Sequence, residues 1–368
     1  MYAIPKMHKT PVKFRFIVSC KDTAIKPIAK TATLGMKICQ KQHEIYCKVI
    51  RNYTGINRFF IAENSQKISG DLNFINSKSI AKSVDTFDFT SLYTFIPHDS
   101  LKQNLDWYID KAFNGAKGRG KQFMSIYNKE AKWVSKHRET TCAFDKLCFQ
   151  KLQHFIINNS YFMVGNIILR QEIGIPMGID PAPFYANGHL YKYEFDFQEE
   201  MTKKNYTIAK SLNHTHRYID DISPLNDRGN FEKFRQDIYP PELILVKQNN
   251  SEMSASVLDI QIDVVENKFQ TKVFDKRDDF PFNICRYPSL SSNIPDITLY
   301  NVFYSQILRI YRICNILNSF ISSVKALVQR CIAKGGTRKK LKFQIKKFFE
   351  RHKPFKFDIL LEDMLIIF

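Results

Sequence analysis

The sequence predicts an α+β fold with a mostly antiparallel central sheet. Short strand-like runs alternate irregularly with helical segments, and the last part of the chain is helical and increasingly basic. At 368 residues, of which 44% are hydrophobic, the chain can bury a large core and hold two or three subdomains. We find no stretch of about eighteen uncharged apolar residues, so no membrane span is expected.

The elements of the first half are expected as follows. Alternating apolar and basic residues at 12–19 predict a strand. Residues 81–98 predict a strand that runs into a turn closed by Pro97. Residues 100–160 carry helical spacing with glycine loop signals near 114–120, which predicts a helical segment.

The second half begins with strands. Three short strand-like runs are expected at 161–170, 214–223 and 242–247. Asp180 suits the N-cap of a helix and Pro181 its first position, so a helix is expected to begin there. Residues 257–262 are predicted to pair with 268–273 in a hairpin, and helices are expected from about residue 298 onward.

The chain carries a large positive charge. Fifty-five Lys and Arg against 36 Asp and Glu give a net charge of +19 and a pI near 9.4. Such a surplus favours a polyanionic partner, either nucleic acid or an anionic membrane surface, over a basic surface that binds nothing. The eight cysteines form no CxxC pair and the first residues lack a secretory signal, so an intracellular protein without a zinc knuckle is expected.

Acidic residues at predicted strand ends carry the chemistry. Asp220 and Asp221 stand between Ile219 and Ile222, where two neighbouring carboxylates repel each other unless a cation compensates. Asp88 lies in an aromatic, strand-prone run. If the strands are neighbours, these acids can converge on two Mg²⁺ ions, the arrangement that supports phosphoryl displacement. A solvent-exposed Asp-Asp turn is the alternative.

A glycine-rich loop precedes the helix expected at Asp180. Gly174 and Gly178 flank Pro176, and residues without a Cβ let the backbone approach a ligand closely. A loop that leads into a helix N-terminus suits a nucleotide or a template backbone.

Together and in this order, the motifs resemble the reverse transcriptases of Penelope-like retroelements, and more distantly telomerase and other reverse transcriptases. The resemblance covers nearly the whole chain, with motifs at 4–9, 15–19, 87–93, 174–178, 181–183, 217–221, 239–243 and 274–282. It implies a right-hand polymerase with an antiparallel palm sheet and a helical thumb. The implied subdomains are fingers at 1–80, a palm at 81–288 with a helical fingers insertion at about 100–160, and a basic helical thumb at 289–368.

The resemblance also implies roles for single residues. Asp88 and Asp220 would hold two Mg²⁺ ions, for which Mn²⁺ could substitute, with Asp221 as a further acid and the Phe89 carbonyl as a backbone ligand. The residues expected to bind the incoming nucleotide are Arg15, helped by Lys21 or Lys26, then Tyr93, Pro176, Met177 and Gly178. Tyr93 is expected to be the gate that excludes a ribose 2′-hydroxyl, with a core aromatic as the alternative.

Two basic sites complete the expected machinery. Lys247 is a candidate general acid for the pyrophosphate leaving group, and a surface lysine at a strand end is the alternative. A basic run that includes Arg338, Lys342 and Lys346, interleaved with apolar residues, predicts an amphipathic helix that contacts the nucleic-acid backbone. A solvated helix face or a nuclear-targeting patch is equally compatible with that run.

The implied function is that of an RNA-directed DNA polymerase of a retroelement, which takes an RNA template, a DNA primer and deoxynucleoside triphosphates. It is expected to be made in the cytoplasm and to act in the nucleus. A catalytically decayed nucleic-acid-binding remnant and an RNA-directed RNA polymerase are the alternatives. Gly188 and His189 depart from the bulky apolar residues usual in relatives. Nothing after His352 resembles the GIY-YIG endonuclease of many Penelope-like proteins, so an endonuclease-lacking type, a fragment or a decayed copy is expected.

Overall fold

A computed structural model describes residues 1–7, 11–18, 23–136, 142–280, 282, 284–352 and 356–366 of the chain. His8, Lys9, Ser19, Lys21, Pro281 and Lys353, which belong to predicted motifs or basic runs, lie outside these residues. The fold is a mixture of helices and antiparallel sheets, as predicted. In the described ranges, none of the helices combines the length and the apolar character that crossing a bilayer requires.

Contacts divide the chain into two compact units. Unit 1 comprises Met1–Ile61 and Phe87–Gln248, and unit 2 comprises Ala62–Thr86 and Asn249–Phe368. The fingers, palm and thumb boundaries stay a prediction. The division falls at other positions because residues 62–86 pack with C-terminal elements rather than with the first helix.

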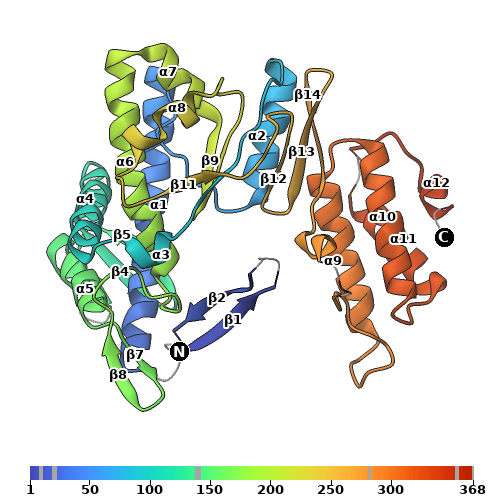
Figure 1. Ribbon diagram of the computed structural model, residues 1–368, viewed down its shortest axis with the longest axis horizontal. Coiled ribbons are helices and arrows are strands. Elements are labelled where there is room, and N and C mark those ends of the chain that lie inside the picture. The colour runs from blue at the N-terminus through green and yellow to red at the C-terminus, as the bar shows by residue number, and fades with distance from the viewer. Residues whose placement is uncertain are drawn as a thin grey trace. The chain divides into compact units, whose positions relative to one another are not determined.

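Helices are the main regular elements of unit 1 (Figure 1). Its helices are α1 (Ile25–Thr54), α3 (Leu92–Phe95), α4 (His98–Lys117), α5 (Lys146–Asn158), α6 (Ala182–Lys204), α7 (Tyr206–Ser211) and α8 (Asn230–Ile238), with the 3₁₀ turn η1 (Leu212–His214). In α1 the buried residues recur three or four positions apart, which gives one apolar stripe. The helix ends where Gly55 adopts a φ of 72° and its N–H bonds the Arg51 carbonyl. The sequence did not predict this helix.

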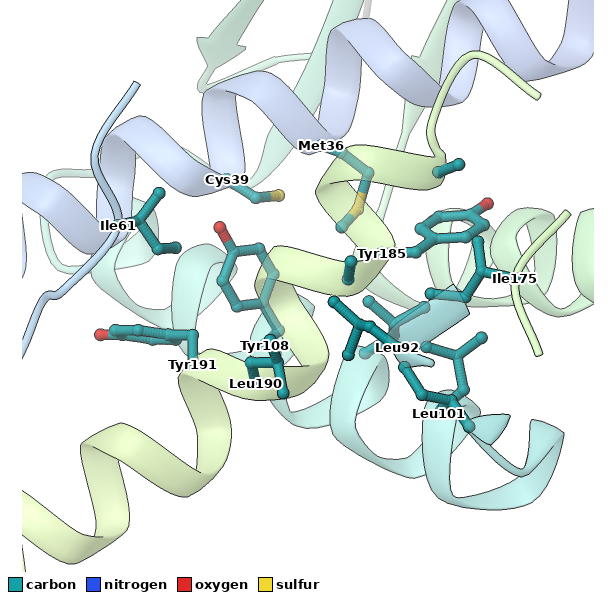
Figure 2. Close-up of a cluster of buried hydrophobic side chains, with 14 of the residues drawn as sticks. Met36, Cys39, Ile61, Leu92, Leu101, Tyr108, Ile175, Tyr185, Leu190 and Tyr191 are labelled. Carbon is teal, nitrogen blue, oxygen red and sulfur yellow. The ribbon is translucent and has the colours of Figure 1, made fainter. Parts of the chain in front are cut away.

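Side chains from α1, α4 and α6 meet in the core of unit 1, where Cys39, Tyr108 and Tyr191 are buried (Figure 2). Gly188 of α6 permits this packing, since a Cβ there would lie 3.1 Å from Leu105 Cδ2. The neighbouring His189 accepts a hydrogen bond at Nδ1 from the Asn104 amide, at 3.1 Å. Burial lowers the pKa of His189 to about 3, so its ring is neutral. The two residues that depart from the family pattern are therefore accommodated.

A four-stranded antiparallel sheet lies in unit 1, in the order β11-β3-β10-β9. Its strands are β3 (Phe87–Phe89), β9 (Thr215–Tyr218), β10 (Asp221–Pro224) and β11 (Leu245–Lys247). Phe87, Phe89, Ile222 and Leu245 are buried on one face of this sheet. The apolar residues of the short strands thus fix which side of the sheet faces the core.

Smaller sheets complete unit 1. They are the hairpin β1 (Tyr2–Lys6) with β2 (Lys13–Ile17), the hairpin β7 (Tyr161–Val164) with β8 (Ile167–Arg170), and the sheet β5-β4-β6 built from β4 (Phe123–Tyr127), β5 (Glu130–Val134) and β6 (Cys142–Phe144). The last of these corrects the prediction that 100–160 is helical, since a sheet interrupts it between α4 and α5. Alternate side chains Met124 and Ile126 are buried while their neighbours are not, a strand pattern too short to detect from sequence.

Two local predictions are also corrected. The predicted strand at 81–98 is only three residues long, and Pro97 precedes α4 instead of closing a turn. Asp180 does not cap α6, because its carboxylate forms an ion pair with Lys26 at 2.8 Å and the helix begins at Ala182.

Unit 2 combines a sheet with helices. It contains α2 (Ser65–Lys78), the sheet β12-β13-β14, the 3₁₀ turn η2 (Lys276–Asp279), and the helices α9 (Ile297–Ile313), α10 (Leu317–Ile332), α11 (Arg338–Arg351) and α12 (Leu361–Leu365). The strands are β12 (Ser254–Val257), β13 (Ile260–Val265) and β14 (Lys268–Val273). The predicted turn is confirmed, with Glu266 and Asn267 both at positive φ, but the strand that pairs with 268–273 is 260–265 rather than 257–262, and Val257 ends β12. The helices predicted from 298 onward are confirmed as well.

Candidate active site

A tight hairpin presents the two adjacent aspartates. Strands β9 and β10 pair from Tyr218 with Asp221 onward, which leaves Ile219 and Asp220 as the two turn residues. Ile219 adopts a φ of 58°, a left-handed conformation that is costly for a β-branched residue. Strain of this kind persists only where the surroundings enforce it.

The structure brings Asp88 to this turn. Asp88 of β3 lies directly opposite Asp221 of β10, and the Phe89 N–H donates to the Asp220 carbonyl at 3.4 Å. Cross-strand partners project from the same face, so Asp88 and Asp221 lie on the face opposite to the buried Phe87 and Phe89. Asp88 and Asp221 on neighbouring strands and Asp220 in the adjoining turn therefore lie at one place.

The donor set suits a hard divalent cation. Carboxylates directly opposite each other on neighbouring strands repel, and a cation with oxygen ligands would relieve that repulsion. As placed, no three Asp, Glu, His or Cys side chains among the described residues are close enough together to form a preformed metal centre. Mutually repelling carboxylates would come together around an ion only when that ion is bound.

Tyr93 lies close to the aspartates. It is partly buried in α3, four residues beyond β3. Burial raises the pKa of Tyr93, and the negative charge of Asp220 raises it further. Tyr93 and Asp220 are therefore near enough to interact electrostatically. This placement is compatible both with the gate and with a ring at the edge of the core.

The glycine loop is bonded to the Tyr93 segment. The Gly174 N–H donates to the Ile96 carbonyl at 2.8 Å, and the Ile175 N–H donates to the Tyr93 carbonyl at 2.7 Å. Gly174 has a φ of +85°, and a Cβ there would lie 2.4 Å from the Tyr93 carbonyl oxygen. Only glycine permits this close approach.

The same loop is bonded to the N-terminal hairpin segment. The Met177 carbonyl accepts from the Val18 N–H at 3.0 Å, one residue after β2 ends. Pro176 is buried, Met177 is partly buried and Gly178 is exposed. Residues 174–178 therefore lie between the Tyr93 segment and the end of β2.

The predicted basic residues lie in different settings. Arg15 is exposed on β2, opposite Ile4 of β1. Lys26 is paired with Asp180, so its ammonium already has an anionic partner. Lys21 lies outside the described residues.

Lys247 lies on the other face of the sheet. It pairs with Phe87 across β11 and β3, so its side chain projects on the side opposite to Asp88. Its ammonium forms an ion pair with Glu232 at 2.8 Å and lies 5.9 Å from the Phe87 ring centroid. This placement does not support the predicted role as general acid.

A buried polar network beneath the turn was not predicted. Arg217 of β9 and Glu194 of α6 are both fully buried and form an ion pair, joined by Asn187 and Tyr239. The sequence carried no local signal for it, because β9 does not alternate: Thr215, His216 and Arg217 are all buried.

The predicted nucleic-acid contacts lie in unit 2. Arg338, Lys342 and Lys346 are spaced four residues apart on α11, whose buried positions are Leu341, Gln344, Ile345, Phe348 and Phe349. Arg338 and Lys346 are exposed and Lys342 is partly so. The predicted amphipathic helix is confirmed as a helix, and these three residues lie along the edge of its buried stripe.

A second pair of adjacent aspartates, Asp278 and Asp279, is structural. Asp278 accepts hydrogen bonds from Arg286 at 2.6 Å and from Arg330 at 3.2 Å, within unit 2. These ion pairs hold η2 to α10, so Asp278 has a structural role and is not part of the site expected at Asp220.

Comparisons with known proteins give structural similarity at low identity. No protein-family model matches the sequence, and no curated protein sequence is similar to it. A telomerase from Candida albicans, in complex with a TWJ fragment of telomeric RNA, matches 93% of this chain and 58% of its own at 10% identity, with a TM-score of 0.46. An apo telomerase from Candida tropicalis matches 86% of this chain and 55% of its own at 12% identity, with a TM-score of 0.43. The chain thus spans less than three fifths of these proteins, and similarity at this level does not establish a shared activity.

Proposed function

We propose that the chain is the polymerase core of a reverse transcriptase, an RNA-directed DNA polymerase of a Penelope-like retroelement. It would transfer a nucleotide from a deoxynucleoside triphosphate to the 3′ end of a DNA primer on an RNA template. The single observation that carries the proposal is the position of Asp88 opposite Asp221, beside the turn that holds Asp220.

Asp88 and Asp220 would hold two Mg²⁺ or Mn²⁺ ions, with Asp221 and the Phe89 carbonyl as further oxygen donors. When bound, such ions stabilise both the attacking and the leaving oxygens of a phosphoryl displacement. The chain itself would supply the positioning: Tyr93 beneath the sugar, residues 174–178 against the template and nucleotide, and Arg15 toward the triphosphate. Lys247 is left out of this proposal because its ammonium lies on the other face of the sheet.

The partners follow from charge. A net charge of +19 and the basic stripe of α11 support binding to a polyanion, here the template–primer duplex. A nuclear site of action is part of the same proposal.

Primer extension with Mg²⁺ tests the aspartates. Asp88→Asn or Asp220→Asn should abolish extension of a DNA primer on an RNA template and leave template binding intact, because the amide cannot replace an ionised ligand. Asp221→Asn should be damaging but less so. Asp99→Asn is the matched control, since Asp99 is 91% exposed on α4 and only pairs with Lys102. Near wild-type extension by Asp220→Asn would refute the assignment.

The same assay separates the alternatives. A decayed remnant would bind template and primer without extending them, and an RNA-directed RNA polymerase would extend with ribonucleotides in preference to deoxynucleotides. The departure at Gly188 and His189 does not favour the remnant, because both residues pack in the helix core without a clash.

A further inference from the structure

The turn that carries Asp220 rests on a buried ion pair. Arg217 Nε and Nη2 donate to the two carboxylate oxygens of Glu194, the second of them at 3.1 Å. Both side chains are 0% exposed. The Tyr239 hydroxyl donates to the same carboxylate at 2.8 Å. The network therefore fixes the plane of the guanidinium group from two sides.

The remaining guanidinium nitrogen reaches the turn. Arg217 Nη1 donates to Asn187 Oδ1 at 2.9 Å and to the Ile219 carbonyl at 3.2 Å. Ile219 is the residue with a φ of 58°, and its carbonyl belongs to the peptide that precedes Asp220. The Arg217 backbone is held as well, because its N–H donates to the Phe60 carbonyl at 2.7 Å.

Stability alone gives little reason for this arrangement. Removing two charges from water is costly, and well-packed apolar residues of similar volume often stabilise a core as well or better. A buried ion pair is retained more readily where it fixes one geometry. Here the forked guanidinium group of Arg217 bonds Glu194 and also directs one N–H to the carbonyl of the strained Ile219. The single ammonium group of a lysine could not make both contacts.

We propose that Arg217 is a positioning residue for Asp220. Glu194, Asn187 and Tyr239 hold the guanidinium group below the sheet, and its Nη1 holds the Ile219 carbonyl so that the turn presents Asp220 beside Asp88. Arg217 touches neither metal nor substrate in this role. The inference rests on the proposed function, because it assumes that the turn presents Asp220 to the metal ions.

The test compares two buried arginines of the same unit. Arg217→Lys keeps the charge and removes the fork. Arg58→Lys is the matched control, because Arg58 is 7% exposed and pairs with Glu199 at 2.9 Å but has no bond to the turn. Binding of Mn²⁺ to each protein is measured by electron paramagnetic resonance of the free ion, and stability by urea unfolding. Mg²⁺ dependence, kcat and KM for the deoxynucleotide are taken from primer extension.

Groups that orient metal ligands typically change metal affinity by about 10–100-fold when altered. Arg217→Lys should weaken Mn²⁺ binding by about tenfold or more, raise the Mg²⁺ concentration for half-maximal extension by a similar factor, and lower kcat more than it raises KM. Arg58→Lys should leave Mn²⁺ affinity unchanged, whatever stability it loses. Equal Mn²⁺ affinities of the two variants would overturn the inference.

A second variant covers the case in which Arg217→Lys does not fold. Tyr239→Phe removes only the hydroxyl that bonds Glu194, and it should weaken Mn²⁺ binding in the folded protein; unchanged affinity would again overturn the inference. Failure of the proposed function has a different signature. In that case the wild-type protein does not extend primers, and Asp88→Asn binds Mn²⁺ as well as the wild type does. This holds whatever the arginine variants do.

Discussion

Replacing Gly174 by alanine tests the junction between the glycine loop and the Tyr93 segment. Gly174 has a φ of +85°, and the added Cβ would lie 2.4 Å from the Tyr93 carbonyl oxygen and 2.9 Å from Thr94 Cα. Both atoms belong to the backbone, so neither can rotate away. The loop must move by roughly an ångström to restore a normal contact distance.

The expected loss of stability has two parts. A non-glycine residue in the left-handed region costs about 1–2 kcal/mol. The displacement also breaks the 2.7 Å hydrogen bond from the Ile175 N–H to the Tyr93 carbonyl, worth about 1 kcal/mol. The free energy of unfolding should therefore fall by about 2–3 kcal/mol in total.

Gly165→Ala separates the two parts. Gly165 has a φ of +59° with no atom within 4 Å of its added Cβ, so this variant carries the backbone strain without the clash. Urea unfolding gives the overall stability, and hydrogen exchange at the Ile175 amide gives the local opening free energy. The clash should appear as faster exchange of that amide in Gly174→Ala alone. Equal stability and equal exchange in the two variants would refute the reasoning.

The remaining predictions concern selectivity, binding and pH. Tyr93→Ala should keep deoxynucleotide addition within a modest factor and sharply raise ribonucleotide incorporation. Tyr93→Phe should keep the discrimination, because the aromatic ring and not its hydroxyl excludes the ribose 2′-hydroxyl. If Tyr93→Ala does not fold, Tyr93 is a core aromatic instead. Alanine at Arg338, Lys342 and Lys346 should flatten the decrease of template affinity with salt, since fewer counterions are released, and alanine at the exposed control lysines Lys48, Lys203 and Lys210 should not. Burial lowers the pKa of His43 and of His189 to about 3, below the 6.5 of an unfolded histidine. The unfolded chain therefore binds more protons as pH falls from 6.5 toward 3, and the free energy of unfolding should decrease by up to about 1.4 kcal/mol per pH unit for each histidine. His189→Gln should reduce that slope in urea titrations, and an unchanged slope would contradict it.

The sequence predicted elements whose signals are local. The hairpin of β13 and β14 has alternating side chains on both sides of Glu266 and Asn267, residues that tolerate the positive φ of the turn. The turn between β9 and β10 has no such signal: its residue at positive φ is Ile219, and 214–223 was predicted as one strand-like run with an Asp-Asp turn only as the alternative. The neighbouring position of Asp88 was reached through the resemblance, because no local signal states which strands pair.

The features that the sequence did not predict depend on distant partners. Helix α1 was missed because its buried stripe includes small and polar residues, such as Ala29 and His43, whose burial depends on α4 and α6. The buried position of Arg217 was missed because Glu194, which neutralises it, lies on another element. The face that Lys247 occupies could not be predicted, because only the register of β11 with β3 determines it.

The division of the chain has a consequence for its synthesis. The chain leaves unit 1 after Ile61 and returns at Phe87, so α2 is made early but belongs to unit 2, where its partners are β14 and α9. The apolar residues Ile68, Leu72 and Ile75 of α2 must wait until Lys268 and the residues beyond it leave the ribosome. At a synthesis rate of about 5–20 residues per second, that delay is on the order of 10–40 s. Throughout this interval the apolar face of α2 would be exposed on the nascent chain. Chaperones that bind exposed apolar segments are therefore expected to bind it.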